Sequence, residues 1–212
     1  MNSSTRENPR QTQDRPAPDS TAPLKLVVIV SSNRKGRFGP VIADWFVEHA
    51  RLHREFQVDV VDLGEEDLPT ALTDDLPPQA AESLGRISPR LAAAEAFVVI
   101  TPEYNHSFPA SIKSLIDWHF TEWRAKPVAF VSYGGLSGGL RAVEQLRQVF
   151  AELHAVAIRD TVSFHQAQGR FDGDGRPKDP AGCDPAAVSL LDQLAWWGRT
   201  LRDAKAVRPY TG

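Results

Sequence analysis

The sequence contains little sulfur and no long apolar segment. Cys183 is the only cysteine among 212 residues, so an internal disulfide is excluded. No run approaches the roughly 20 apolar residues that a membrane-spanning helix requires. The first residues also lack the apolar stretch that is typical of a signal peptide. These absences predict a cytoplasmic protein without a membrane partner.

The sequence also lacks a strong excess of either charge. It has 24 basic and 27 acidic residues, which gives a formal net charge of −3. Domains that bind nucleic acid usually carry a clustered positive charge, so no nucleic-acid partner is expected. The hydrophobic content of 42% is ordinary for a globular protein, and the length suits one domain with a well-buried core.

The two ends of the chain differ in composition from the part between them. Residues 1–22 are rich in Ser, Thr, Pro, Gln and charge, and they offer little apolar surface to bury. Such a composition predicts a disordered N-terminal tail. We therefore expect a single domain over residues 23–206, followed by a short C-terminal tail at residues 207–212.

Between the tails, apolar runs typical of strands alternate with segments of helical periodicity. The predicted strands span residues 24–30, 56–63, 96–100, 127–132 and 155–164. The predicted helices span residues 41–52, 82–94, 109–120 and 137–153, and a last helix runs from a cap at Asp184 to about residue 203. Ser107 could cap the helix that begins at Pro109.

This alternation predicts an α/β fold with right-handed crossovers between parallel strands. Five such units match the flavodoxin-like, doubly wound sheet of order 2-1-3-4-5, with helices on both faces. Ligands bind such sheets beyond the carboxyl ends of the strands, where the strand order reverses. Here that point lies between the first and third strands.

The loop after the first predicted strand, SSNRKGRFGP, has the composition of an anion-binding loop. Arg34, Lys35 and Arg37 place three cations within four residues, and a helix follows at once. Helix N-termini attract anions, and arginine matches the geometry of phosphate. The loop matches neither the phosphate loop of nucleoside triphosphatases nor the dinucleotide fingerprint. A solvated basic turn with a serine cap remains the alternative.

Two further unusual loops follow the third and fourth strands. TPEYNHSFP offers main-chain N–H groups and an aromatic side chain, which suit a flat ring with a polar edge. SYGGLSGG contains four glycines, which permit a ligand to approach the backbone closely. Each loop could instead be a plain connection. In the predicted order the first, third and fourth strands are neighbours, so their loops would share one edge of the sheet.

A metal site is not predicted. His49 and His53 have the spacing of a helical metal pair, but no carboxylate completes the H-E-x-x-H pattern. We interpret them as residues of an exposed helix face. Cys183 lies outside any C-x-x-C motif, so no reactive role is assigned to it.

Taken together, these motifs resemble those of the NAD(P)H-dependent FMN reductases and their quinone, azo-dye and chromate reductase relatives. The resemblance covers about residues 24–162. The matching positions are Arg34, Gly36 and Arg37 in the first loop, the run Pro102-Glu103-Tyr104-Asn105 with Ser107, Pro109, Lys113 and Ile116-Asp117-Trp118, and the third loop from Ser132 to Gly139.

The resemblance implies FMN bound without a covalent link. It assigns the phosphate to Ser32, Arg34, Arg37, Phe38 and Gly39. It assigns one side of the flavin ring to Pro102, Glu103, Tyr104 and Asn105, and the other to Ser132, Tyr133, Gly134 and Gly135. His106 and Ser137 are candidates for the substrate side. No protein side chain is expected to act as the catalyst, because the flavin carries the redox chemistry.

The activity that the resemblance implies is hydride transfer from NADPH or NADH to the flavin. Electrons then pass to a small acceptor (a quinone, a flavin, an azo compound or a metal oxyanion) in a ping-pong mechanism. A homodimer or tetramer is also expected. The alternative is a flavodoxin-like electron carrier, or a flavin-binding sensor, without nicotinamide turnover. The near-neutral charge and the arginines of the first loop disfavour a carrier.

Overall fold

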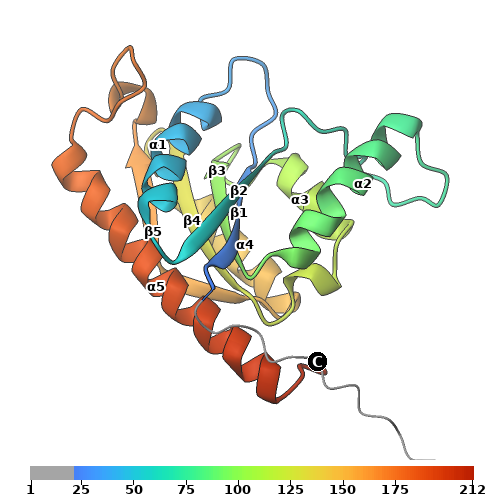
Figure 1. The fold of residues 1–212 in the computed structure, drawn as a ribbon. Coiled ribbons are helices and arrows are strands. Elements are labelled where there is room, and N and C mark those ends of the chain that lie inside the picture. The colour runs from blue at the N-terminus through green and yellow to red at the C-terminus, as the bar shows by residue number, and fades with distance from the viewer. Residues whose placement is uncertain (1–21) are drawn as a thin grey trace, which may run out of the picture.

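Five parallel strands form the central sheet of the structure, a computed structural model that describes residues 22–212 (Figure 1). Their order is β2-β1-β3-β4-β5, so the predicted flavodoxin-like winding is confirmed. The tail predicted at residues 1–22 lies outside the described residues, apart from Ala22. The strands are β1 (Leu24–Val30), β2 (Phe56–Asp62), β3 (Ala96–Pro102), β4 (Pro127–Gly134) and β5 (Val156–His165).

Helices cover both faces of this sheet (Figure 1). On one face α1 (Gly39–Leu52) and α5 (Pro180–Val207) pack against the strands. The other face carries α2 (Pro78–Ala93), α3 (Ala110–Asp117) and α4 (Leu140–Glu152). Short 3₁₀ turns, η1 (Thr121–Trp123) and η2 (Ala167–Gly169), follow α3 and β5. Because both faces are covered, β3 is buried along its whole length, which explains its unbroken apolar run.

The region after α3 contributes mainly to the core. Trp123 is fully buried, and its ring lies 4.7 Å from that of Phe97 and 5.4 Å from that of Phe150, measured between centroids. Ile112 and Leu115 are also fully buried, whereas Phe120 is 49% exposed. These three buried side chains pack within this chain and are not available to a partner. The homo-oligomer stays a prediction.

Two predicted helix caps are wrong, and α2 and α4 begin at Pro78 and Leu140 instead of residues 82 and 137. Helix α5 begins at Pro180, because the Asp179 carboxylate accepts a hydrogen bond from the Gly182 N–H and caps the helix there. The predicted cap, Asp184, instead accepts a hydrogen bond from the Trp45 indole. The Ser107 hydroxyl likewise does not cap α3, since it donates to Gln145. A side chain that forms a hydrogen bond with a residue distant in sequence is not available to cap the helix start.

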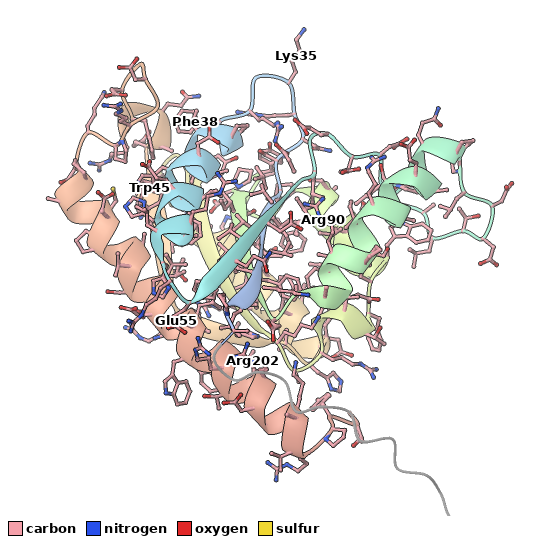
Figure 2. All side chains as sticks on the ribbon, in the orientation of Figure 1. Lys35, Phe38, Trp45, Glu55, Arg90 and Arg202 are labelled. Carbon is pink, nitrogen blue, oxygen red and sulfur yellow. The ribbon has the colours of Figure 1, made fainter. Side chains whose placement is uncertain are left out.

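Arginines from neighbouring helices cover both edges of the sheet. On β2, Arg90 pairs with Asp59 at 2.7 Å and donates to the Val60 carbonyl (Figure 2 shows Arg90 on α2, facing β2). On β5, Arg147 donates to the carbonyls of Ile158 and Arg159. Occupied backbone groups cannot pair with a further strand, so both edges are protected against aggregation. No helix in residues 22–212 has the length and apolarity to cross a bilayer.

Lys126, just before β4, is an unusual buried cation. It is only 8% exposed, and its ammonium group donates to the carbonyls of Leu91 and Ala92 at 2.9 and 3.0 Å. These carbonyls belong to the last turn of α2, where cations are favourable. Burial, reinforced by the positive charge of Lys205, lowers the pKa of Lys126 to about 8. The folded state therefore holds this proton less tightly than the unfolded chain does.

Stability should rise with pH because of Lys126. Between the folded pKa of about 8 and the ordinary lysine pKa of 10.5, the unfolded chain binds the proton more tightly. The free energy of unfolding should then increase by about 2 kcal/mol from pH 8 to pH 10. Lys126→Met should remove this increase, and Lys25→Met, at an exposed position, should retain it. Urea unfolding at the two pH values checks this, and an unchanged slope in Lys126→Met would contradict it.

Candidate functional site

Four loops at the carboxyl ends of β1, β3, β4 and β5 surround a pocket of about 460 Å³. This volume lies within the range of small-molecule sites, about 300–1,000 Å³. The three loops singled out in the sequence are all present, and a fourth joins them. The pocket is lined by Arg34, Phe38, Pro102, Glu103, Tyr104, Tyr133, Gly134, Gly135, Gln166, Ala167, Gln168 and Gly169.

Beside this pocket, the start of α1 has the features of an anion cradle. The hydroxyl oxygens of Ser31 and Ser32 are buried, and neither has a hydrogen-bond partner within the described residues. Helix α1 has no side-chain cap at its N-terminus. A Cβ atom added at Gly39 would lie 2.3 Å from the Ser32 hydroxyl and 2.9 Å from the Tyr133 hydroxyl. The Ser32 and Tyr133 hydroxyls thus converge at the start of α1.

The hydroxyl of Tyr133 stays neutral in this setting. Burial raises the pKa of Tyr133 to about 12, and the nearby Ser32 hydroxyl opposes that rise without completing a hydrogen bond of good geometry. The group can therefore donate a hydrogen bond at any physiological pH. Phe38 packs edge-on against the Tyr133 ring, with 6.4 Å between the centroids. The aromatic wall and the cradle consequently form one continuous surface.

The three cations of the first loop have different surroundings. The Arg34 guanidinium lies over the Tyr104 ring, 5.5 Å from its centroid, and lines the pocket. Lys35 projects from the outer end of the loop, away from the sheet (Figure 2). Arg37 pairs with Asp62 at the end of β2, with N–O distances of 2.5 and 2.8 Å, and also donates to the Ser32 carbonyl.

Arg37 holds the first loop in place. Its guanidinium is paired with Asp62 and does not point freely into the cradle. Its pKa is raised, above all by the hydrogen bond to Asp62, although burial opposes the effect. Its guanidinium also lies against Gly64, where a Cβ would approach to 2.4 Å. Direct contact of Arg37 with a phosphate stays a prediction. In the structure Arg37 links the loop after β1 to the end of β2.

The second loop forms a tight turn at the pocket rim. Tyr104 and Ser107 exchange main-chain hydrogen bonds of 2.8 and 3.0 Å. The two central residues are left-handed, with φ of 49° at Asn105 and 72° at His106, as in a type I′ turn. The N–H groups of Glu103 and Tyr104 have main-chain partners, but that of Asn105 has none within the described residues. His106 is exposed and does not line the pocket.

The carboxylate of Glu103 turns toward the third loop. It accepts hydrogen bonds from the Ser137 hydroxyl at 2.5 Å and from the Arg141 guanidinium at 2.9 Å. Burial alone would raise the pKa of Glu103, but these donors and the charge of Arg141 leave it lowered. The carboxylate therefore stays ionised and joins two walls of the pocket. Ser137, a predicted substrate-side residue, is occupied by this contact.

Glycines shape the third loop. Gly138 and Gly139 have φ of 61° and 86°, which other residues rarely adopt. A Cβ at Gly135 would meet nothing within 4 Å, so this position leaves open space at the pocket wall. The Ser132 hydroxyl, predicted to face the ligand, instead donates to the Gly138 carbonyl at 2.8 Å and is buried. Its role is to fix the loop.

The fourth wall, Gln166–Gly169, was not predicted as part of the site. It follows β5, and the Gln166 N–H donates to the Gly135 carbonyl at 2.9 Å. Lys178 donates to the Gly169 carbonyl and holds the segment from outside. The segment has no charged or glycine-rich signature, so only its place after the fifth strand could have indicated it. In the predicted order that strand lies beside the fourth.

Comparison with known proteins identifies relatives of this chain. Residues 24–169 match the family described as NADPH-dependent FMN reductase. An NAD(P)H-dependent FMN reductase of Saccharomyces cerevisiae is 34% identical over 81% of this chain and 90% of its own length. One from Schizosaccharomyces pombe is also 34% identical, over 59% of this chain, but the match spans only 64% of that relative.

The fold also matches solved structures. The flavoenzyme FerB, an NAD(P)H:(acceptor) oxidoreductase from Paracoccus denitrificans, aligns over 84% of this chain and 98% of its own, with a TM-score of 0.67 and 24% identity. At that identity the likeness concerns the fold alone.

The glycines of the third loop give a matched test of this geometry. A Cβ at Gly139 would lie 2.8 Å from the Tyr133 backbone nitrogen, and its φ is 86°. Gly139→Ala should therefore lower the free energy of unfolding by about 2 kcal/mol or more. Gly135→Ala, in open space, should change it by no more than about 1 kcal/mol. Urea unfolding measures both, and equal effects would refute the loop geometry.

Proposed function

We propose that this chain, which belongs to the NADPH-dependent FMN reductase family, binds FMN and uses it to reduce a small acceptor with electrons from NADPH or NADH. The observation that carries the proposal is the junction of an anion cradle with a ring-sized pocket at one edge of the sheet. FMN has a phosphate and a flat ring joined by a flexible chain, and it needs both features side by side.

The cradle fits the phosphate of FMN. The unpartnered hydroxyls of Ser31 and Ser32 and the uncapped start of α1 supply donors. Tyr133 adds a neutral hydroxyl, and Arg34 adds charge from the pocket side. Charge-assisted hydrogen bonds of this kind are about twice as strong as neutral ones. Arg37 contributes by holding the loop against β2.

The pocket fits the ring system. Tyr104 and Tyr133 offer aromatic surface, and Gly134 and Gly135 allow close approach on the other side. The N–H of Asn105 has no partner within the described residues, so it would be available to the polar edge of the ring. The main-chain groups of Glu103 and Tyr104, by contrast, hold the turn together.

Bound FMN would supply the redox chemistry, by accepting a hydride from the nicotinamide and reducing the acceptor. The chain contributes orientation and charge. The Glu103 carboxylate at the pocket wall is engaged by Ser137 and Arg141, so no acid or base role is assigned to it. Donor and acceptor would each contact the ring bound in this pocket, one after the other. Parallel lines in double-reciprocal plots are therefore expected, as in a ping-pong mechanism.

An anaerobic titration tests the proposal against a carrier or sensor. The protein is reconstituted with FMN, and its visible absorption is recorded during addition of NADPH and, separately, NADH. Bleaching of the bound flavin by either donor is the expected result, followed by recolouring with a quinone. Bound flavin that resists both donors would favour a flavodoxin-like carrier or a sensor instead. The faster donor identifies the preferred nicotinamide.

The two neighbouring cations of the first loop should differ in their effect on FMN affinity. Arg34 lines the pocket, whereas Lys35 points away from it. Arg34→Ala should raise the dissociation constant of FMN about 10- to 100-fold, the value of a charged hydrogen bond. Lys35→Ala should raise it less than about threefold, through long-range attraction only. Quenching of flavin fluorescence measures both constants, and equal effects would remove the assignment of Arg34.

A further inference from the structure

Two side chains of α4, one helical turn apart, form hydrogen bonds with the second loop. Arg141 and Gln145 are separated by four residues and therefore project from the same side of the helix. Arg141 contacts Glu103, and Gln145 contacts His106 and Ser107. Neither Arg141 nor Gln145 lines the pocket. Any effect they have on a ligand must pass through the loop.

The first contact joins a charge to a helix terminus. The N-cap of α4 is Gly139, which has no side chain to cap the helix. The carboxylate of Glu103, a residue outside α4, caps the helix instead. It accepts hydrogen bonds from the Arg141 N–H at 3.3 Å and from the Arg141 guanidinium at 2.9 Å. Carboxylates are favourable at helix N-termini. The contact therefore stabilises α4 and the second loop together.

The second contact holds a strained turn. The Gln145 amide donates to the His106 carbonyl at 2.8 Å and accepts from the Ser107 hydroxyl at 2.5 Å. His106 has φ of 72°, and Asn105 has φ of 49°. Left-handed conformations of non-glycine residues are unfavourable and persist only where the surroundings enforce them. Gln145 holds the turn through both the N–H group and the oxygen of its side-chain amide.

We propose that Arg141 and Gln145 are positioning residues that hold the second loop in its binding conformation before the ligand arrives. The identity of the ligand as FMN rests on the function proposed above. Their contribution is preorganisation: a loop that is already ordered loses less conformational entropy on binding. The N–H of Asn105, which has no partner within the described residues, belongs to the turn that these contacts hold.

Arg141 has an additional electrostatic role. The Glu103 side chain is only 9% exposed and belongs to a residue that lines the pocket. Its charge is compensated by Arg141 and by the start of α4. Without Arg141, an uncompensated negative charge would remain beside the ring and would disfavour the more negative, reduced flavin. Loss of Arg141 should therefore shift the midpoint potential of bound FMN to more negative values, and Arg141→Lys should restore part of the shift.

The test compares Gln145→Ala with Gln148→Ala, a matched change at an exposed position of the same helix. Hydrogen exchange of the Tyr104 and Ser107 amides is measured in the FMN-free protein, and FMN affinity is measured by fluorescence quenching. In Gln145→Ala and in Arg141→Ala, exchange should be at least about tenfold faster and FMN binding at least about tenfold weaker. Gln148→Ala should change neither, and Arg141→Lys should lie between Arg141→Ala and the wild type.

The outcomes distinguish failure of the positioning role from failure of the proposed function. Unchanged exchange in both Ala variants would overturn the positioning role, as would faster exchange with unchanged FMN affinity. An unmoved midpoint potential in Arg141→Ala would overturn the electrostatic role of Arg141. If the wild-type protein binds no FMN, the proposed function fails, and the exchange rates still decide whether α4 orders the loop. Far-UV circular dichroism confirms that each variant is folded.

Discussion

The parallel pairing of β1, β3, β4 and β5 is the constraint on which the rest of this structure depends. Strands that run in one direction end at one edge, so the loops that follow them meet there whatever their separation in sequence. The same pairing buries the central strands on both faces and places the start of α1 at this edge. The fold thus assembles a helix start, two tyrosines and a glycine-rich loop into one pocket.

The site contains features that cost stability. Within residues 22–212, two buried serine hydroxyls lack partners, and each such group costs about 1–3 kcal/mol. The turn at Asn105 and His106 adds backbone strain. Contacts from outside the pocket hold these features in place, namely Arg37 with Asp62, and α4 with the second loop. A ligand that satisfied the hydroxyls would recover part of this cost.

Local sequence patterns predicted the strands and the loops that form most of the pocket wall, whereas the sheet order came from the match of five strand–helix units to a known winding. Apolar runs mark strands, and the glycines and cations mark loops at strand ends. Long-range partners were not predictable in this way. Nothing in the first loop shows that Arg37 pairs with Asp62, or that Asp184 is taken by Trp45 and leaves the cap to Asp179. Gln166–Gly169 lies at the site only because the strand it follows, β5, is next to β4 in the sheet.

The most direct test of the combined cradle and pocket compares FMN with riboflavin, which has the same ring and no phosphate. Dissociation constants are obtained for both from the quenching of flavin fluorescence by the wild-type protein at one ionic strength. Tight binding of FMN, with riboflavin at least about 100-fold weaker, is predicted, because the cradle would recognise the phosphate through charge-assisted hydrogen bonds. Equal affinity for the two ligands would contradict the cradle, and binding of neither would contradict the flavin site as a whole.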